Sequence, residues 1–159
     1  MKTNRNIQYI VVHCTATPAN TPTANILAGW KQLGWRNPGY HFLVDACGRI
    51  ERLLSIDAIA NGAKGYNRNS IHVAYTGGVV PQATTHKLMP ADTRTEAQRR
   101  VLRALVALLH AEFPKARVVG HRDLSPDLNG NGVIEPAEYT KACPCFDVQR
   151  EYRRMLTAA

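Results

Sequence analysis

The chain has 159 residues, of which 45% are hydrophobic, so it is long and apolar enough for one domain with its own core. Its 20 basic residues against 12 acidic ones give a net charge of +8, which favours an anionic partner such as a cell-wall polymer, a membrane surface or a nucleic acid, unless the charges only keep the surface solvated. Four cysteines do not suggest a disulfide scaffold in a chain of this length, and no apolar stretch approaches membrane-spanning length.

The first half of the chain alternates short apolar runs with turn-forming residues. The run that ends at His13 is rich in Ile and Val, which is typical of a buried strand. Apolar residues at helical spacing before Gly34 predict a helix that this glycine ends. In chain order, the expected elements are a strand at 7–13, a helix at 23–33, a hairpin of strands at 40–45 and 49–54, a polar loop at 61–70 and a strand at 71–76.

The second half begins with a stretch, to about residue 92, for which the pattern predicts no regular structure. The clearest helix begins near Thr93, because Thr93 and Glu96 have the spacing of a capping box, and Pro114 ends it. A short strand at 118–119 and a last helix at 147–156 follow. Since strands alternate with helices, we expect the α/β class, with one domain over 1–159 and a mixed central sheet flanked by helices.

Three residues with zinc-ligating side chains stand at the ends of predicted elements. His13 ends the first strand, His121 follows the last strand, and Cys143 lies near the carboxyl end of the chain. Imidazole and thiolate are the usual zinc ligands, and three protein ligands with one open position are typical of a catalytic site. Cys145 is the alternative fourth ligand, which would close the site and make it structural.

Six short motifs occur in order along nearly the whole chain. They are Ile10–Thr17, Gly39–Phe42, Lys64–Ile71, Gly77–Gly78, Gly120–His121 and Lys141–Pro144. Together they resemble the phage-lysozyme type of zinc N-acetylmuramoyl-L-alanine amidase, in the superfamily that includes the peptidoglycan-recognition proteins. The motifs are far more specific in this order than any one of them alone.

The resemblance implies a zinc enzyme and a role for each matching residue. His13, His121 and Cys143 match the zinc ligands of the family, and Tyr40 and Lys141 match its active-site tyrosine and lysine. The implied substrate is the amide between the lactyl group of N-acetylmuramic acid and the L-alanine of the stem peptide. Zinc would polarise that carbonyl and lower the pKa of a bound water to about 7. Lys141 would stabilise the tetrahedral oxyanion, and Tyr40 would donate to it or help to move a proton.

The chain departs from the family at two positions. The family often carries a histidine or another polar residue where this chain has Gly62, so we expect one substrate contact or supporting hydrogen bond to be missing. Cys145 stands where related phage enzymes tend to have serine.

Strand alternation predicts that Cys14 faces away from the side of His13, and that His41 faces away from Tyr40 and is structural. No motif assigns a role to the remaining histidines, His72, His86 and His110.

A second metal signal lies between His121 and Lys141. Residues 127–138 match the twelve-residue calcium loop, within an insertion at about 123–140. The predicted calcium ligands are Asp127, Asn129, Asn131, the carbonyl of Val133 and a bidentate Glu138. The alternative is an Asn/Gly-rich loop that only resembles a cation site, because no entering helix precedes it. If calcium binds there, it would fix His121 relative to Cys143.

We therefore expect a zinc-dependent amidase that cleaves peptidoglycan, as the endolysin of a phage or prophage. One alternative is a non-catalytic peptidoglycan-binding protein on the same fold, although such relatives typically lack the cysteine ligand. Others are a cytoplasmic amidase that recycles soluble muropeptides and, from charge alone, a protein that binds nucleic acid or a polymerase. The expected partner is peptidoglycan or a muropeptide, with no nucleic acid, no membrane insertion and a monomeric state. The basic start lacks the apolar region of a signal peptide, which predicts a cytoplasmic protein until it is released to the wall.

Overall fold

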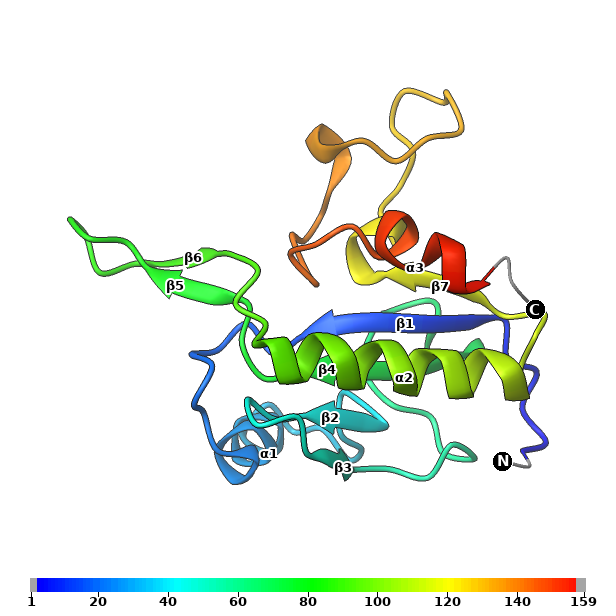
Figure 1. The fold of residues 1–159 in the computed structure, drawn as a ribbon, viewed down its shortest axis with the longest axis horizontal. Helices are drawn as coiled ribbons and strands as arrows, with labels where there is room; N and C mark the ends of the chain where they lie inside the picture. Colours follow the sequence, from blue (N-terminus) through cyan, green and yellow to red (C-terminus); the bar gives the residue numbers. More distant parts are fainter. Residues whose placement is uncertain (1–2, 157–159) are drawn as a thin grey trace.

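The structure, a computed structural model, describes residues 3–156 and centres on a five-stranded mixed sheet (Figure 1). Its strand order is β3-β2-β4-β1-β7, and only β3 runs antiparallel to its neighbour. The strands are β1 (Tyr9–Cys14), β2 (Phe42–Val44), β3 (Ile50–Arg52), β4 (Ser70–Tyr75) and β7 (Arg117–Gly120). The predicted α/β class with a mixed central sheet is confirmed.

Three helices cover the sheet on its two faces. They are α1 (Thr23–Gln32), α2 (Glu96–Glu112) and α3 (Val148–Leu156), and short 3-10 turns lie at Asn67–Asn69, His121–Leu124 and Pro136–Glu138. Side chains of α2 and α3 join the main apolar core with alternate residues of β1, β2 and β4, such as Ile10 and Val73. Ile26 of α1 packs on the opposite face, against Leu43 and Ala74. No helix in the described part of the chain is long and apolar enough to span a membrane.

Strand alternation decides which side chains of β1 face which helix layer. β1 is buried from Ile10 to Cys14 because it pairs with parallel strands on both sides, which explains its nearly continuous apolar sequence. Cys14 joins the core under α2, so it faces away from His13, as predicted. The α1 face of the sheet is therefore the side on which His13 lies.

The prediction of an irregular stretch before the second helix was wrong. Strands β5 (Val79–Pro81) and β6 (Leu88–Pro90) form an antiparallel hairpin, which projects from the body of the molecule (Figure 1). Each strand has three residues, and nearly all of them are exposed, so no buried face imposes the alternation by which a strand is recognised.

The capping box of α2 lies two residues beyond the predicted one. Thr95 is the N-cap, and its side chain accepts the backbone N–H of Gln98 while the Gln98 side chain accepts the backbone N–H of Thr95. Thr93 instead accepts the backbone N–H of Gly78, at 2.7 Å. Both threonines have an acidic or amide residue three positions later, so only the tertiary contact of Thr93 decides between them.

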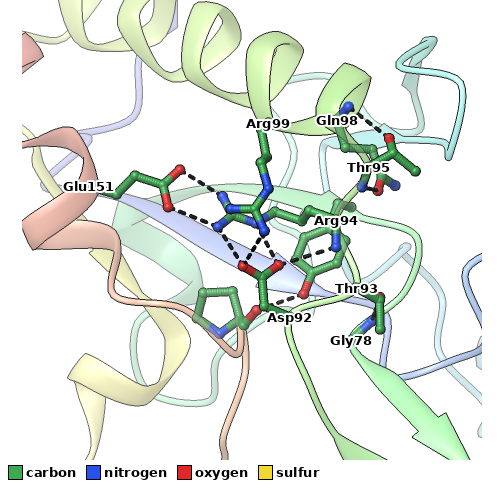
Figure 2. A network of polar contacts seen from close by, with 10 residues as sticks. Gly78, Asp92, Thr93, Arg94, Thr95, Gln98, Arg99 and Glu151 are labelled. Atoms are coloured by element: carbon green, nitrogen blue, oxygen red, sulfur yellow. Dashed lines mark hydrogen bonds and ion pairs between the residues drawn. The ribbon is translucent and has the colours of Figure 1, made fainter.

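Arg94 ties the start of α2 to the carboxyl-terminal segment (Figure 2). Its fully buried guanidinium donates to Glu151 of α3 at 2.8 Å and to Asp92 at 2.9 Å, and lies 3.2 Å from the ring centre of Phe146. Arg99 reaches the same Asp92 carboxylate from the surface. Since Phe146 follows Cys143 by three residues, this network holds the segment that carries the predicted cysteine ligand.

Candidate metal centre

Parallel strand pairing brings the two predicted histidine ligands together. β1 and β7 are neighbours and run in the same direction, so their carboxyl ends lie at one edge of the sheet. His13 lies near the end of β1, and His121 follows β7 directly. Their ring centres are 4.8 Å apart, although 108 positions separate them in the sequence (121 − 13).

Cys143 completes a group of three donor atoms. Its Sγ lies 3.7 Å from Nδ1 of His13, and the donor atoms of His13, His121 and Cys143 all lie within 4.8 Å of one another. Within residues 3–156 this is the one group of three or more His, Cys, Asp or Glu side chains close enough to hold a metal ion. Two nitrogens and one sulfur are a donor set that suits zinc, so the residues fit the metal.

The backbone holds Cys143 in place from two sides. The N–H of Arg122 donates to the carbonyl of Cys143 at 2.8 Å, which joins it to the turn that carries His121. The N–H of Cys14 donates to the Cys143 sulfur at 3.2 Å, which joins it to the end of β1. The nearby Cys143 sulfur and burial raise the pKa of the Cys14 thiol to about 12, so Cys14 stays protonated.

The two histidines are neutral at physiological pH. Burial, together with His72, His121 and Lys141, lowers the pKa of His13 well below its usual value, and His13 is only 1% exposed. Burial and the Lys141 charge lower the pKa of His121 to about 4. A neutral imidazole has the free lone pair that a metal ion requires.

Cys145 does not face the donor group. Its thiol donates to the carbonyl of Gly78 at 3.4 Å and lies 3.9 Å from the sulfur of Cys14. The Cys14 thiol and burial raise the pKa of Cys145, which disfavours the thiolate that a metal ligand must be. The arrangement therefore favours three protein ligands and an open position over a closed structural site.

Tyr40 and Lys141 both border a cavity beside the donor group. The cavity has a volume of about 500 Å³, and its lining includes Trp30, Trp35, Tyr40, Lys64, His121, Lys141 and Cys143. The ring centre of Tyr40 lies 5.0 Å from that of His13, and its hydroxyl donates to the carbonyl of Cys14 at 3.1 Å. Burial and the sulfurs of Cys143 and Cys14 raise the pKa of Tyr40, so its phenol keeps its proton.

The sequence reasoning missed His72. Its Nδ1 lies 2.9 Å from Nε2 of His13, and it is fully buried. The signal was present in the alternation of β4, because His72 and Ala74 share the face that His13 occupies on β1. His41, which we predicted to be structural, is also fully buried and accepts the backbone N–H of His72 at 2.9 Å.

The side chains of the predicted calcium loop accept hydrogen bonds from backbone N–H groups of the same loop. Glu138 accepts three backbone N–H groups, at 2.7, 3.2 and 2.8 Å, and Asp127 accepts two, each at 2.7 Å. The side chains of Asn129 and Asn131 also accept backbone N–H groups of the loop, and the segment projects from the body (Figure 1). Nothing in these contacts points to a bound cation, so the calcium site at 127–138 stays a prediction.

Comparison with known proteins decides the family. The sequence profile of the N-acetylmuramoyl-L-alanine amidase family matches residues 3–145. The chain belongs to this family. The amidase is similar to the endolysin of Enterobacteria phage K11, at 33% identity over 87% of this chain and 81% of the relative, and to that of Escherichia phage T7, at 31% over 96% and 90%. A Haemophilus influenzae protein without an assigned function is 47% identical over 58% of this chain and 76% of its own length.

Solved structures share the fold of this amidase. The N-acetylmuramoyl-L-alanine amidase LysC from Clostridium intestinale superposes with a TM-score of 0.69 at 23% identity, over 96% of this chain and 87% of that one. The peptidoglycan recognition protein PGRP-SA of Apis mellifera superposes with a TM-score of 0.62 at 17% identity, over 93% and 82%. At these identities the likeness supports the architecture alone.

Proposed function

We propose that this amidase is a zinc-dependent endolysin that hydrolyses the amide between N-acetylmuramic acid and L-alanine in peptidoglycan. The observation that carries the proposal is the His13, His121 and Cys143 donor group beside the cavity that Tyr40 and Lys141 border. The endolysin relatives support a wall substrate, and the net charge of +8 suits an anionic wall.

The three donors would hold zinc, which supplies a Lewis acid for the scissile carbonyl and for the attacking water. Lys141 is exposed at the rim of the cavity, where its ammonium would stabilise negative charge that develops on the carbonyl oxygen. The protonated hydroxyl of Tyr40 would donate to the same oxygen or pass a proton to the leaving amine. Trp30 and Trp35, stacked at 6.1 Å, form an apolar wall beside them.

We also propose that the protein is made in the cytoplasm and reaches the wall only after a separate protein has permeabilised the membrane. Calcium binding at 127–138 is the remaining part of the proposal, and it depends on the match of that segment to the calcium loop.

The decisive experiment measures free L-alanine amino termini released from purified peptidoglycan. The zinc-loaded protein should release them, and the chelated protein and the Cys143→Ala variant should not. Cys145→Ser is the matched control, because that thiol faces Gly78 and not the donor group, and it should retain activity.

A non-catalytic peptidoglycan-binding protein would give the opposite pattern. Zinc-loaded wild type would then sediment with insoluble wall and release no amino termini from any wall type. Release from soluble muropeptides but not from intact wall would instead identify a recycling amidase.

A further inference from the structure

The imidazole of His72 is the hydrogen-bond partner of the predicted ligand His13. β4 pairs with β1 so that His72 lies opposite Val11, one pleat from His13 and on the same face of the sheet. The ring centres of the two histidines are 5.1 Å apart, and Nε2 of His13 lies 2.9 Å from Nδ1 of His72. The other nitrogen of His13, Nδ1, faces the sulfur of Cys143.

This geometry fixes the proton on each ring if His13 holds a metal. Nδ1 of His13 must then be unprotonated, so Nε2 carries the hydrogen and donates it to Nδ1 of His72. His72 in turn carries its own hydrogen on Nε2. That atom is buried and has no hydrogen-bond partner in the described part of the chain.

The ring of His72 also packs against the ring of His41. The two rings stack, with centres 5.8 Å apart and planes 8° from parallel. Nδ1 of His41 accepts the backbone N–H of His72, and its Nε2 lies 3.2 Å from the carbonyl of Ala58. His41 therefore contacts both the backbone and the ring of His72.

Gly62 provides the space that the His72 ring occupies. A Cβ atom at position 62 would lie 2.4 Å from Nδ1 and 2.6 Å from Cγ of His72, and 2.8 Å from the carbonyl oxygen of Gly39. Any side chain there would displace the imidazole from His13. Position 62 is also where the family resemblance implies a polar side chain. In this chain the neighbouring strand β4 supplies a hydrogen-bond partner for His13.

We propose that His72 is a positioning residue, which orients His13 and holds its Nδ1 toward the metal, and that Gly62 is required to make room for it. The inference rests on the proposed zinc function, because it assigns the role of His72 through a metal ligand. It predicts that zinc affinity depends on an acceptor atom at the Nδ1 position of residue 72, and not on the bulk of the side chain.

Two substitutions at His72 separate these possibilities. Oδ1 of asparagine takes the place of Nδ1 of histidine, so His72→Asn keeps the acceptor, while His72→Leu has a similarly branched shape and no acceptor. We would measure the zinc dissociation constant by competition with a chromophoric chelator, and the absorption spectrum of the cobalt-substituted protein. We expect His72→Leu to bind zinc about 10- to 100-fold more weakly and to change the cobalt spectrum. His72→Asn should stay within about threefold of wild type in the same assay, since the bond is retained.

The inference is overturned if His72→Leu binds zinc as tightly as wild type, or if the two variants weaken it equally. If either variant does not fold, Gly62→Ala provides the test, because its Cβ must move the His72 ring; unchanged zinc affinity there also overturns the inference. The wild type distinguishes this failure from that of the proposed function. A wild type that binds no zinc removes the proposed function, whereas normal zinc binding by both wild type and His72→Leu removes only the role of His72.

Discussion

The sulfur of Cys143 lies 3.7 Å from Nδ1 of His13, across 130 positions of sequence. One residue belongs to the first strand and the other to the segment that precedes the last helix, so the donor group exists only when both ends of the chain are folded together. Metal binding should therefore stabilise the whole domain, because the unfolded chain cannot present this group.

Lys141 should contribute to catalysis and not to metal binding. In Lys141→Gln the positive charge beside the developing oxyanion is lost, and we expect kcat to fall by about 100- to 1000-fold. The Lys141 charge lowers the pKa of both His13 and His121 by repelling their cationic forms. The same charge repels a zinc ion held by these histidines, so zinc affinity should be unchanged or slightly higher without it. The measurement is amino-terminus release with zinc affinity determined in parallel.

The control for that variant is Lys115→Gln, which removes the same charge from an exposed lysine in a different surface hollow. It should leave kcat unchanged. An equal loss in both variants would show that net charge, and not the position of Lys141, determines the rate.

The metal-free protein should lose stability in mild acid. Burial lowers the pKa of His41 and His121 to about 4, and that of His13 and His72 well below the usual value. Between pH 6.5 and about 4 the unfolded chain therefore binds more protons than the folded chain, so the free energy of unfolding falls as the pH falls. Each fully buried histidine would contribute up to about 1.4 kcal/mol per pH unit.

Urea unfolding at several pH values in the presence of a chelator measures this slope. His72→Asn removes one of the four histidines with a lowered pKa, so the free energy of unfolding should fall less steeply as the pH falls. A midpoint that stays constant from neutral pH to the lower end of this range would contradict the prediction.

Arg94 should matter far more for stability than Arg99, although both contact Asp92 (Figure 2). The Arg94 side chain is 0% exposed, so Arg94→Ala leaves a cavity beside Phe146 and two carboxylates without their main partner. We expect a loss of about 3 kcal/mol, the lower end of the range for a broken buried pair, since Asp92 and Glu151 keep some contact with solvent. The Arg99 side chain is 40% exposed, so Arg99→Ala should lower the free energy of unfolding by less than about 1 kcal/mol.

Denaturant unfolding of Arg94→Ala and Arg99→Ala compares the two directly. Because Arg94 also holds the segment that follows Cys143, its variant should bind zinc more weakly as well. Equal losses of stability in the two variants would show that burial of the Arg94 pair does not decide its contribution.

Calcium should raise the melting temperature of the zinc-loaded protein if the loop at 127–138 binds it. A site with two asparagine ligands should be weak, with a dissociation constant on the order of 10⁻⁴–10⁻³ M. Glu138→Gln should abolish the shift, whereas Glu135→Gln, at the ninth loop position, should only reduce it. No shift in millimolar calcium would remove the calcium prediction.

The sequence by itself determined the class of fold, and it predicted the three residues whose donor atoms the structure brings together. The apolar run before His13 identified a buried strand because a strand between two parallel neighbours has no solvent-facing side. His13, His121 and Cys143 could be named because their chemistry is specific and because they stand in recognisable motifs. The exposed β5–β6 hairpin could not be found, since no buried face shaped its sequence.

Only the tertiary structure decided which groups support those donors. His72 carries no sequence motif, and its contact with His13 depends on the register of two strands that are distant in the chain. From the sequence, Gly62 indicated the loss of a polar side chain. In the structure, the ring of His72 occupies the space that a side chain at position 62 would need. The direction of the Cys145 side chain, toward the carbonyl of Gly78, likewise favours an open position over a fourth protein ligand. Ligand identity is a local chemical property, whereas orientation depends on packing between segments that the sequence does not place side by side.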